Sequence, residues 1–487
     1  MTTDVNVRSW LDEANRTSPW PTVTVLVAGI GVSGYSAAAG LLQVGARVIV
    51  VDERDGDAER EKATILETLG ADVRLGAGTT QSLPDGVDVV VTSPGWRPDA
   101  PLLVEAAKRD LPILGEVDLA LRLRDPERPA PWLAVTGTNG KTTTVGMVAA
   151  ILRAAGLRTA AVGNIGSPVV DAVLDPTPYD VLAVELSSFQ LHWARPLGAR
   201  AAAVLNVAPD HLDWHGSMDA YARDKGKIYE GCEVACVYNV ADPTTEDLVR
   251  AADVVEGCRA IGFTAGIPAV GMIGIVDGVI ADRAFVAQRQ TSAAELCKLD
   301  DLPSQAPHNI ANALAAAALA RAFGVPPAAV RAGLSGFHLE PHRIQYVAEH
   351  NGVTYVDDSK ATNAHAALAS LLSYEPVVWI AGGLAKGQEF DDLVQTVKGR
   401  LRGVVLLGQD RHLLADALAR HAPDVPVVEV AGGDTEVMDR VVASAAQLAQ
   451  PGDTVLLAPG CASFDLFDSY AARGDAFAAS VRRLGGR

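Results

Sequence analysis

Short runs of apolar residues alternate with amphipathic stretches along most of the chain. Apolar runs at residues 23–27, 132–135 and 377–380 each enter a Gly-rich loop, and helix-compatible sequence follows, for example at residues 143–155. Strands that are buried on both faces of a parallel sheet are apolar throughout, because helices cover both faces. The pattern therefore predicts an α/β fold with parallel sheets, and a small Gly- and Val-rich β-structure at residues 262–286.

Two stretches rich in proline and charge are typical of connectors between domains. They lie at residues 125–131 and 339–343. Proline disfavours helical conformation at the residue before it, which favours a boundary in each stretch. A chain of 487 residues is long enough for about three domains. We predict domains at residues 1–120, 121–340 and 341–487.

The composition is that of a globular protein, and it limits the partners. Hydrophobic residues make up 49% of the chain, and the formal net charge is −18. This charge disfavours general binding to nucleic acid or to anionic membranes, although a local basic pocket for an anionic small molecule is compatible with it. Residues 1–5 lack the features of a signal peptide, and no uncharged apolar run reaches about 18 residues. We expect no leader, no membrane-spanning helix and a cytoplasmic location.

The five cysteines are Cys232, Cys236, Cys258, Cys297 and Cys461. An odd number with uneven spacing is unlike a disulfide framework. The Cys232-x3-Cys236 pair has no second pair of ligands in its sequence neighbourhood, so we expect no structural zinc there. Reduced thiols fit a cytosolic protein.

The first Gly-rich loop has the spacing G-x-G-x-x-G at residues 29–34, and Asp52 ends the next predicted strand. Glycines permit a tight turn and let a phosphate approach the backbone at the start of a helix. Binding of NAD is one interpretation, because the acidic residue suits a ribose hydroxyl. A uridine diphosphate group fits the same turn, and a turn that binds no nucleotide is the third interpretation.

The second Gly-rich loop, from Thr136 to Thr142, has the layout of a P-loop between a predicted strand and a predicted helix. Backbone amides and the helix dipole hold phosphate oxygens, Lys141 reaches the β- and γ-phosphates, and the Thr142 hydroxyl suits Mg²⁺. The loop departs from G-x-x-x-x-G-K-[ST], because Val135 occupies the position of the first glycine. We predict a nucleoside triphosphate site here, with a chance Gly-Lys-Thr turn as the alternative.

Two candidate metal ligands follow the P-loop in the sequence. Glu185 ends an apolar run that begins at Val181, where a carboxylate suits Mg²⁺ and a solvated acid is the alternative. His211 follows another predicted strand and is a candidate for a second cation or for placing a phosphate, although a lone histidine is more often only hydrogen-bonded. Lys225 lies in a charged helical segment, where spacing alone predicts a solvated side chain.

Further polar clusters lie in the last third of the chain. Asn309 and Asn312 share one face of a predicted Ala-rich helix, where they suit a purine edge or a helix cap. Residues 357–363 follow a predicted strand and combine acids, a cation and hydroxyls, which suits a ligand or a plain polar loop. Residues 457–465 follow the last apolar run in the same way.

Taken in order over nearly the whole chain, these motifs resemble those shared by the Mur ligases of peptidoglycan synthesis. The shared motifs are residues 136–142, 185–190, 206–213, 308–312 and 342–343. Residues 358–363 and 461–465 are similar to the members of the family that add D-glutamate. The resemblance implies three α/β domains: an N-terminal Rossmann-like domain that binds UDP, a central P-loop ATPase-like domain and a C-terminal Rossmann-like domain.

The resemblance also implies an activity and its substrates. It implies an ATP-dependent amide-bond ligase that adds D-glutamate to UDP-N-acetylmuramoyl-L-alanine through an acyl phosphate, with two Mg²⁺ ions and a carbamate on Lys225. A carboxylate and an amine do not condense unaided, because oxide is a poor leaving group, and an acyl phosphate removes that obstacle. Cationic groups offset the repulsion between carboxylate and phosphate. We expect a monomer.

The resemblance assigns a role to each candidate residue. Matches to ATP-binding positions are Gly137, Thr138, Asn139, Gly140, Lys141, Thr142, Thr143, Asn309, Asn312, Arg343 and Asp358. Matches to UDP-substrate positions are Gly31, Val32, Ser33, Gly34, Arg54, Ser93, Pro94, Gly95, Asn164, Ser187 and Gln190. Matches to D-glutamate positions are Lys360, Thr362, Lys386, Ser463, Phe464 and Tyr470. Matches to catalytic positions are Lys141, His211 and Lys225, and matches to metal positions are Thr142, Glu185, His211 and Lys225.

Two residues depart from the family pattern, and other functions compete. Glu53 stands where the family has a threonine that contacts uracil, and Tyr470 stands where phenylalanine is common. A ligase of the same type for another amino acid is one alternative. An NAD-dependent oxidoreductase rests on residues 29–34 with Asp52 and leaves the P-loop unexplained. A nucleotide-binding switch without ligase chemistry rests on the P-loop alone.

Overall fold

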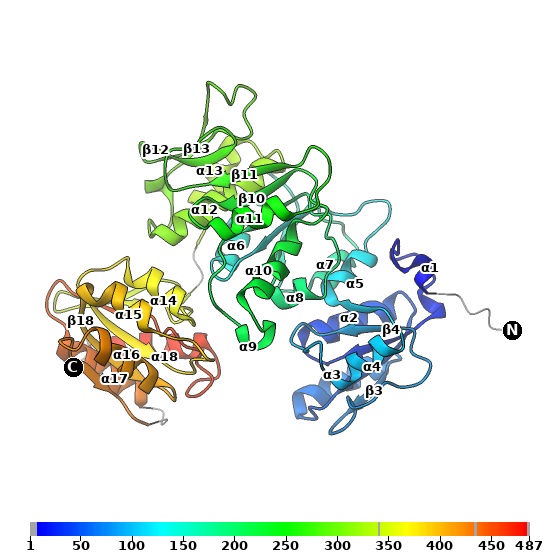
Figure 1. Cartoon of the computed structure of the whole chain (residues 1–487), viewed down its shortest axis with the longest axis horizontal. Helices are drawn as coiled ribbons and strands as arrows, with labels where there is room; N and C mark the ends of the chain where they lie inside the picture. Colours follow the sequence, from blue (N-terminus) through cyan, green and yellow to red (C-terminus); the bar gives the residue numbers. More distant parts are fainter. Residues whose placement is uncertain (1–6, 339–340, 433–435, 485–487) are drawn as a thin grey trace. The chain divides into compact units, whose positions relative to one another are not determined.

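The computed structural model describes residues 7–338, 341–432 and 436–484. In this part of the chain the strands form three sheets, and helices pack against them (Figure 1). The described residues of 1–207, 216–303 and 311–337 form one compact unit, and those of 208–215, 304–310 and 338–487 form a second. Residues 1–5, on which the expectation of no leader rests, and part of the predicted connector at 339–343 lie outside the described residues.

The first sheet is Rossmann-like, with the strand order β3-β2-β1-β4-β5 and parallel pairing throughout its described strands. Because β1 lies between β2 and β4, the loops that follow β1 and β4 meet at the carboxyl edge of the sheet. The strands are β1 (Thr24–Ala28), β2 (Arg47–Asp52), β3 (Asp72–Leu75), β4 (Val89–Thr92) and β5 (Ile113–Gly115). The helices are α1 (Arg8–Leu11), η1 (Trp20–Thr22), α2 (Val32–Gln43), α3 (Asp57–Thr68), α4 (Pro101–Lys108) and α5 (Glu116–Arg122).

The second sheet has the order β14-β13-β12-β11-β10-β9-β6-β8-β7. It is parallel from β7 to β12, and β12, β13 and β14 pair antiparallel. The strands are β6 (Trp132–Thr136), β7 (Thr159–Gly163), β8 (Val181–Glu185), β9 (Ala201–Val204), β10 (Ala235–Asn239), β11 (Arg259–Phe263), β12 (Met272–Val276), β13 (Val279–Asp282) and β14 (Ala294–Lys298). The helices are α6 (Lys141–Ala154), α7 (Val169–Val173), α8 (Ser188–His192), α9 (Leu212–His215), α10 (Met218–Gly226), η2 (Lys227–Tyr229), α11 (Pro243–Ala251), η3 (Leu299–Asp301), α12 (Pro307–Ala322) and α13 (Pro327–Ser335).

The third sheet has the order β15-β16-β20-β17-β18-β19 and is parallel except for β15. Its strands are β15 (Gln345–His350), β16 (Val353–Asp357), β17 (Val377–Gly382), β18 (Leu401–Leu407), β19 (Val427–Glu429) and β20 (Thr454–Leu457). The helices are α14 (Ala364–Leu371), α15 (Asp391–Val397), η4 (Lys398–Arg400), α16 (Arg411–His421), α17 (Val437–Leu448) and α18 (Tyr470–Leu484).

The apolar runs of the third sheet supply two cores, one on each face. Val377 and Trp379 of β17 belong to one buried cluster, and Val378 and Ile380 belong to the other. Successive side chains of a strand point to opposite faces, so a strand between two helical layers must be apolar at every position. This is the physical reason that continuous apolar runs mark strands in this chain.

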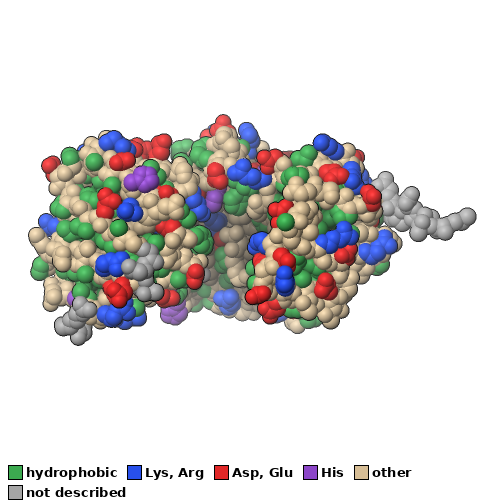
Figure 2. Space-filling view, turned by 90° about the horizontal axis from the view of Figure 1, so that it is seen from below, with side chains coloured by type: hydrophobic (Ala, Val, Ile, Leu, Met, Phe, Trp, Pro, Cys, Tyr) green, Lys and Arg blue, Asp and Glu red, His purple; other side chains and the backbone are tan. Residues whose placement is uncertain are grey.

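The distribution of surface charge and the character of the helices bear on two expectations, those about nucleic acid and about membranes. Figure 2 shows Lys and Arg side chains interspersed with Asp and Glu on the face in view, rather than gathered in one basic patch. Within the described residues, none of the helices combines the length and the apolar character that a membrane crossing requires.

Candidate active site

The predicted P-loop follows β6, which lies between β8 and β9 in the second sheet. Asn206, which lies just after β9, makes three hydrogen bonds to this loop. Its carbonyl accepts from the Thr138 amide at 3.0 Å, its side-chain oxygen accepts from the Asn139 amide at 2.9 Å, and its Nδ2 donates to the Asn139 carbonyl at 3.2 Å. The loop is therefore fixed by a neighbouring strand end, as expected where strand order reverses in an α/β sheet.

Gly140 ends the loop and precedes the first residue of α6. Its φ is +84°, and a Cβ atom added there would lie 2.4 Å from Asn312 Oδ1. A side chain at position 140 would thus be strained and would collide with the amide. The amide of Asn312 therefore lies against the P-loop. Asn309, one turn earlier on α12, is buried, and its Nδ2 has no hydrogen-bond partner among the described residues.

Two lysines converge on the P-loop backbone. Lys141 Nζ donates to the carbonyls of Gly137 and Thr138, both at 2.9 Å, and Lys225 Nζ donates to the same Gly137 carbonyl at 3.0 Å. Lys225 is 1% exposed, and its Nζ lies 4.4 Å from the centre of the Tyr221 ring. The solvated side chain that spacing alone predicts for Lys225 is wrong. The burial comes from tertiary contacts, which leave no signal in the local sequence.

Glu185 ends β8 beside the start of the P-loop, with Val135 as its pairing partner in β6. Its side chain is buried, and Asn164 Nδ2 donates to its Oε1 at 2.9 Å. The second oxygen, Oε2, is buried without a hydrogen-bond partner among the described residues. A buried carboxylate oxygen without a partner is costly, and a hard cation such as Mg²⁺ is a fitting partner for it. The residues present therefore fit a magnesium ion at this edge.

Ser187 and Gln190 form a capping box at the start of α8. The Ser187 hydroxyl accepts from the Gln190 amide at 3.2 Å, and Gln190 Oε1 accepts from the Ser187 amide at 2.9 Å. Sequence reasoning treated both residues as site-like and missed this local role, although S-x-x-Q before an apolar residue is its signature. The box fixes both side chains just after Glu185.

The predicted UDP-binding residues that follow β1, β2 and β4 gather at the carboxyl edge of the first sheet, whereas Asn164, Ser187 and Gln190 follow β7 and β8 of the second sheet. A Cβ at Gly34 would lie 1.9 Å from the Gly29 carbonyl oxygen, so only glycine permits this packing. Ser93, after β4, brings its hydroxyl to the same turn and has no hydrogen-bond partner among the described residues. A Cβ at Gly31 would lie 3.9 Å from the Arg54 guanidinium. The loops after β1, β2 and β4 therefore meet here, with Val32 exposed at the start of α2.

Asp52 has its carboxylate occupied by the protein. It accepts from the Ile30 amide at 2.8 Å and from two nitrogens of Arg54, at 2.8 and 3.1 Å. Burial alone raises the pKa of Asp52, but the hydrogen bonds from Arg54 and Ile30 outweigh it and lower the pKa. A carboxylate engaged in this way is poorly placed to bind the ribose hydroxyl of NAD. Nearby, Glu53 accepts from Thr80 at 2.7 Å.

The predicted D-glutamate residues follow adjacent strands of the third sheet, β16, β20 and β17. The loops after β17 and β20 are tied by two backbone hydrogen bonds between Leu384 and Ala462, each 2.9 Å long. Lys386 and Ser463 lie directly beyond this pair, and Ser463 is buried, whereas Phe464 is 68% exposed. After β16, Lys360 Nζ lies 4.9 Å from the centre of the Tyr470 ring.

Arg473 is a residue that sequence reasoning missed. It is buried on α18 and donates to the Ser359 hydroxyl at 3.0 Å, to the Ser359 carbonyl at 2.8 Å and to the Cys461 carbonyl at 3.1 Å. It thereby ties the loop after β16 to the loop after β20. Burial lowers the pKa of Arg473 to about 10, which leaves it charged near neutral pH.

The acid and base groups of the second unit have strongly altered environments. Burial raises the pKa of Asp358 to about 6, although a hydrogen bond from Ser370 and the charge of Arg343 both favour the carboxylate. Burial, together with the charge of Arg343, lowers the pKa of His308 to about 4. The charge of Arg343 therefore acts on both Asp358 and His308: it favours the charged form of the carboxylate and disfavours the charged form of the imidazole.

His211 belongs to the second unit, and the P-loop residues belong to the first. Its backbone is left-handed, with φ +53°, and its Nε2 lies 3.6 Å from Asp210 Oδ2. A left-handed histidine is uncommon and is often tied to function. The structure thus brings Lys141, Lys225, Glu185 and Asn312 together, and it does not relate His211, Arg343 or the D-glutamate residues to them.

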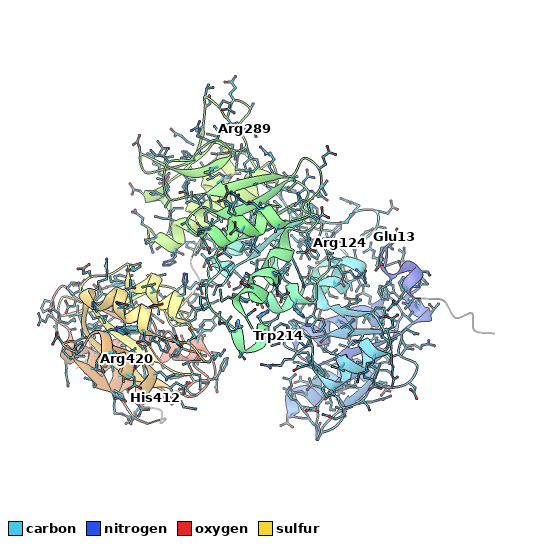
Figure 3. The ribbon with its side chains drawn as sticks, viewed as in Figure 1. Glu13, Arg124, Trp214, Arg289, His412 and Arg420 are labelled. Atoms are coloured by element: carbon cyan, nitrogen blue, oxygen red, sulfur yellow. The ribbon has the colours of Figure 1, made fainter. Side chains whose placement is uncertain are left out.

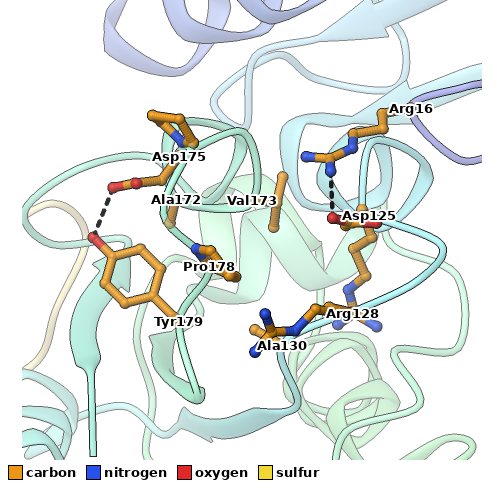
Figure 4. A pocket seen from close by; sticks show the side chains of 11 residues that line it. Arg16, Asp125, Arg128, Ala130, Ala172, Val173, Asp175, Pro178 and Tyr179 are labelled. Carbon is orange, nitrogen blue, oxygen red and sulfur yellow. Dashed lines mark hydrogen bonds and ion pairs between the residues drawn. The ribbon is translucent and has the colours of Figure 1, made fainter.

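A small pocket of about 40 Å³, open to solvent, lies between segments of the first unit (Figure 4). Arg16, Arg124 and Arg128 line it, and Arg16 pairs with Asp125. Arg124, which is labelled in Figure 3, lies 4.1 Å from the centre of the Trp132 ring, and burial lowers its pKa to about 10. None of the predicted site residues lines this pocket, so it is separate from the candidate active site.

The fold and site define an α/β protein with three sheets and a P-loop, in which the predicted site residues follow the strands. Three domain families match the chain: the Mur ligase MurD-like N-terminal domain at residues 23–115, the Mur ligase middle domain at 135–320 and the Mur ligase glutamate ligase domain at 342–461. The chain belongs to the Mur ligase family.

Relatives with curated names match over almost the full length. The UDP-N-acetylmuramoylalanine–D-glutamate ligase of Streptomyces avermitilis is 62% identical over 96% of this chain and 99% of its own. The enzyme of the same name from Mycolicibacterium smegmatis is 46% identical over 95% of this chain and 97% of its own. Among solved structures, UDP-N-acetylmuramate–alanine ligase from Thermotoga maritima has a TM-score of 0.55 at 18% identity, with 95% and 99% of the chains covered. That likeness shows the fold alone.

The predicted fold class, with three α/β domains of Rossmann-like and P-loop type, is confirmed. The predicted family is confirmed as well. The domain limits at residues 120 and 340 and the individual site residues stay predictions.

Proposed function

We propose that this protein joins D-glutamate to UDP-N-acetylmuramoyl-L-alanine with the cleavage of ATP to ADP and phosphate. The observation that carries the proposal is the full-length match, at 62% identity over 96% of the chain, to a ligase named for that reaction. The match spans all three sheets, so it includes the part of the chain that would select the amino acid.

The P-loop is the proposed site for the ATP phosphates. The loop amides and the first turn of α6 offer N–H donors, and the helix dipole favours negative charge there. Lys141 now donates to two loop carbonyls, and we propose that it exchanges them for oxygens of the β- and γ-phosphates. Asn312 lies against Gly140 and would contact the nucleotide from α12.

Glu185 and Thr142 would hold one Mg²⁺ ion. His211 and a carbamate on Lys225 are the further metal ligands that the family resemblance implies. The unpartnered Oε2 of Glu185 supports the first site. Bound Mg²⁺ would offset the negative charge of the phosphates.

A carbamate on Lys225 is supported by the surroundings of its amine. Lys225 is buried and shares the Gly137 carbonyl with Lys141, so its ammonium lies close to a second cation. The neutral amine is the form of lysine that reacts with CO₂. The carbamate carries two oxygens and a negative charge, which suits a divalent cation.

The proposed reaction has two steps. A carboxylate oxygen of the UDP substrate attacks the γ-phosphorus, forms a C–O–P bond, and ADP leaves. The amine of D-glutamate then attacks the acyl carbon, an amide bond forms, and phosphate leaves while the amine gives up its proton. Lys360 and Lys386 would hold the carboxylates of D-glutamate without engaging its amine. Placing the reactants can supply roughly 7–11 kcal/mol of the barrier.

We further propose a cytoplasmic monomer. All cysteines in the described residues are unpaired, which fits a reducing compartment. One chain carries the predicted positions for ATP, the UDP substrate and D-glutamate.

A substrate panel tests the proposal. The purified chain would be offered UDP-N-acetylmuramoyl-L-alanine and ATP with D-glutamate, L-glutamate, L-alanine or a diamino acid, and the product mass would be measured. The proposal predicts a product with D-glutamate and phosphate release that requires both other substrates. A product with another amino acid, or phosphate release without the acceptor, would contradict it.

A further inference from the structure

Three cysteine side chains meet beside the second sheet. Cys236 lies in β10, Cys232 lies in the turn before that strand, and Cys258 directly precedes β11. The three sulfur atoms lie within 4.8 Å of one another, and Cys236 Sγ is 3.8 Å from Cys258 Sγ. Sequence spacing showed only the Cys232–Cys236 pair. The fold adds Cys258, which lies 22 residues after Cys236.

The spacing of the sulfurs fits coordination of a single ion. Two thiolates bound to one tetrahedral Zn²⁺, each at about 2.3 Å, have sulfurs about 3.8 Å apart. The Cys236–Cys258 distance of 3.8 Å equals this value, and the remaining sulfur pairs lie within 4.8 Å. We propose that Cys232, Cys236 and Cys258 bind one thiophilic divalent cation of the zinc class, with water as the fourth ligand.

The exposure of the cysteines and the lack of a further protein ligand among the described residues support water in the fourth coordination position of the ion. Cys232 and Cys236 are buried, whereas Cys258 is only partly buried and gives access from solvent. Among the described residues, no histidine or carboxylate joins the three sulfurs. Sites with three protein ligands and a water are a known form of zinc coordination.

The local charges also favour a divalent ion. Three thiolates and one Zn²⁺ carry a net charge of −1, since each thiol releases its proton to solvent on binding. Arg259, the next residue after Cys258, donates to the Ala284 carbonyl at 2.9 Å and lies near enough for the Cys258 thiolate to act on its charge.

Binding would join parts of the chain that lead to the candidate active site. Cys232 follows η2, whose Tyr229 hydroxyl accepts from the Val204 amide at 3.0 Å and donates to the Val237 carbonyl at 2.6 Å. The same segment, α10 with η2, carries Lys225. An ion on the three sulfurs would tie the end of this segment to β10 and β11, so we expect it to raise the unfolding temperature.

Metal titration of the full, reduced chain tests the proposal. Zn²⁺ would be titrated against a chromophoric chelator, and Cd²⁺ would be used to record the ultraviolet thiolate-to-metal absorption. We expect one equivalent bound, an absorption intensity of three thiolates, and protection of all three cysteines from alkylation as read by peptide mass spectrometry. Cys258→Ser should weaken Zn²⁺ binding at least about ten-fold, while Cys461→Ser and Cys297→Ser, which lie outside the cluster, should bind as the native chain does.

The outcomes that overturn the proposal are equally specific. Native affinity in Cys258→Ser, equal loss in the Cys461→Ser control, or absent protection of the three cysteines would each contradict it. A Cys236–Cys258 disulfide that persists in reductant would contradict it too. If Cys236→Ser or Cys232→Ser fails to fold, the partly exposed Cys258 variant and the alkylation pattern still decide. None of these readouts depends on ligase turnover, so their failure is distinct from failure of the proposed function.

Discussion

Replacing Glu116 by glutamine should remove a pH dependence from the stability of the first unit. Glu116 begins α5 and is 2% exposed; its Oε1 accepts from the Val170 amide at 2.9 Å, and its Oε2 has no hydrogen-bond partner among the described residues. The pKa of Glu116 is raised from 4.5 to about 7, mainly because burial outweighs the opposing hydrogen bonds from the amides of Val170 and Val169, with a smaller contribution from the charge of Asp171.

The sign and size of the effect follow from this pKa. Between about pH 4.5 and pH 7 the folded chain keeps a proton on Glu116 that the unfolded chain has lost. The contribution of Glu116 to stability is therefore complete below pH 4.5 and is lost as the pH rises through about 7. At 1.36 kcal/mol per pH unit, the loss amounts to about 3 kcal/mol.

Denaturant unfolding of native protein and Glu116→Gln at several pH values between about 5 and 8 measures the effect. Glutamine keeps the acceptor for the Val170 amide and carries no charge. The free energy of unfolding of the variant, relative to that of the native chain, should therefore rise by up to about 3 kcal/mol as the pH rises. Glu67→Gln, an exposed change on α3, is the matched control and should show no such trend. A difference between native and Glu116→Gln that does not change with pH, or that has the opposite sign, would refute the reasoning.

Three further predictions concern the P-loop. Lys141→Ala should lower turnover by about 10²–10³-fold with UDP-substrate affinity unchanged by calorimetry, and a parallel loss of that affinity would contradict its role at the phosphates. Lys225→Ala should be nearly inactive, and added acetate should restore part of its activity. Lys225→Arg, which keeps the charge but cannot form a carbamate, should not regain activity with acetate. Equal recovery of activity in the two variants would exclude the modification. Gly140→Ala should weaken ATP binding at least about ten-fold, because its Cβ would meet Asn312. Gly156→Ala, with φ +80° and open space around the Cβ, is the control and should bind ATP normally. An equal loss of ATP affinity in both variants would show that backbone strain alone acts.

The strands and the P-loop could be predicted from the sequence, because each depends on residues that are close together in the chain. Continuous apolar runs mark the strands because both faces of each sheet are covered, as the alternation of Val377 to Ile380 between two cores shows. The P-loop is readable because its glycines and its lysine are adjacent in sequence. The left-handed Gly140 and the first residue of α6, Lys141, agree with that prediction.

Residues placed by distant contacts could not be found from the sequence alone. Lys225 has the local pattern of a solvated lysine, and contacts made by the fold, among them those with the Tyr221 ring and the Gly137 carbonyl, bury it. Arg473 joins two loops from a helix near the end of the chain. Cys258 joins Cys232 and Cys236 only because β10 and β11 are neighbours.

Isotope tracing of the acceptor carboxylate tests the central claim most directly. UDP-N-acetylmuramoyl-L-alanine labelled with ¹⁸O in its carboxylate would be converted with D-glutamate and ATP, and the released phosphate would be examined by mass spectrometry. Activation through an acyl phosphate predicts one ¹⁸O atom in each phosphate released. Phosphate that carries no label, alongside normal amide product, would contradict the account.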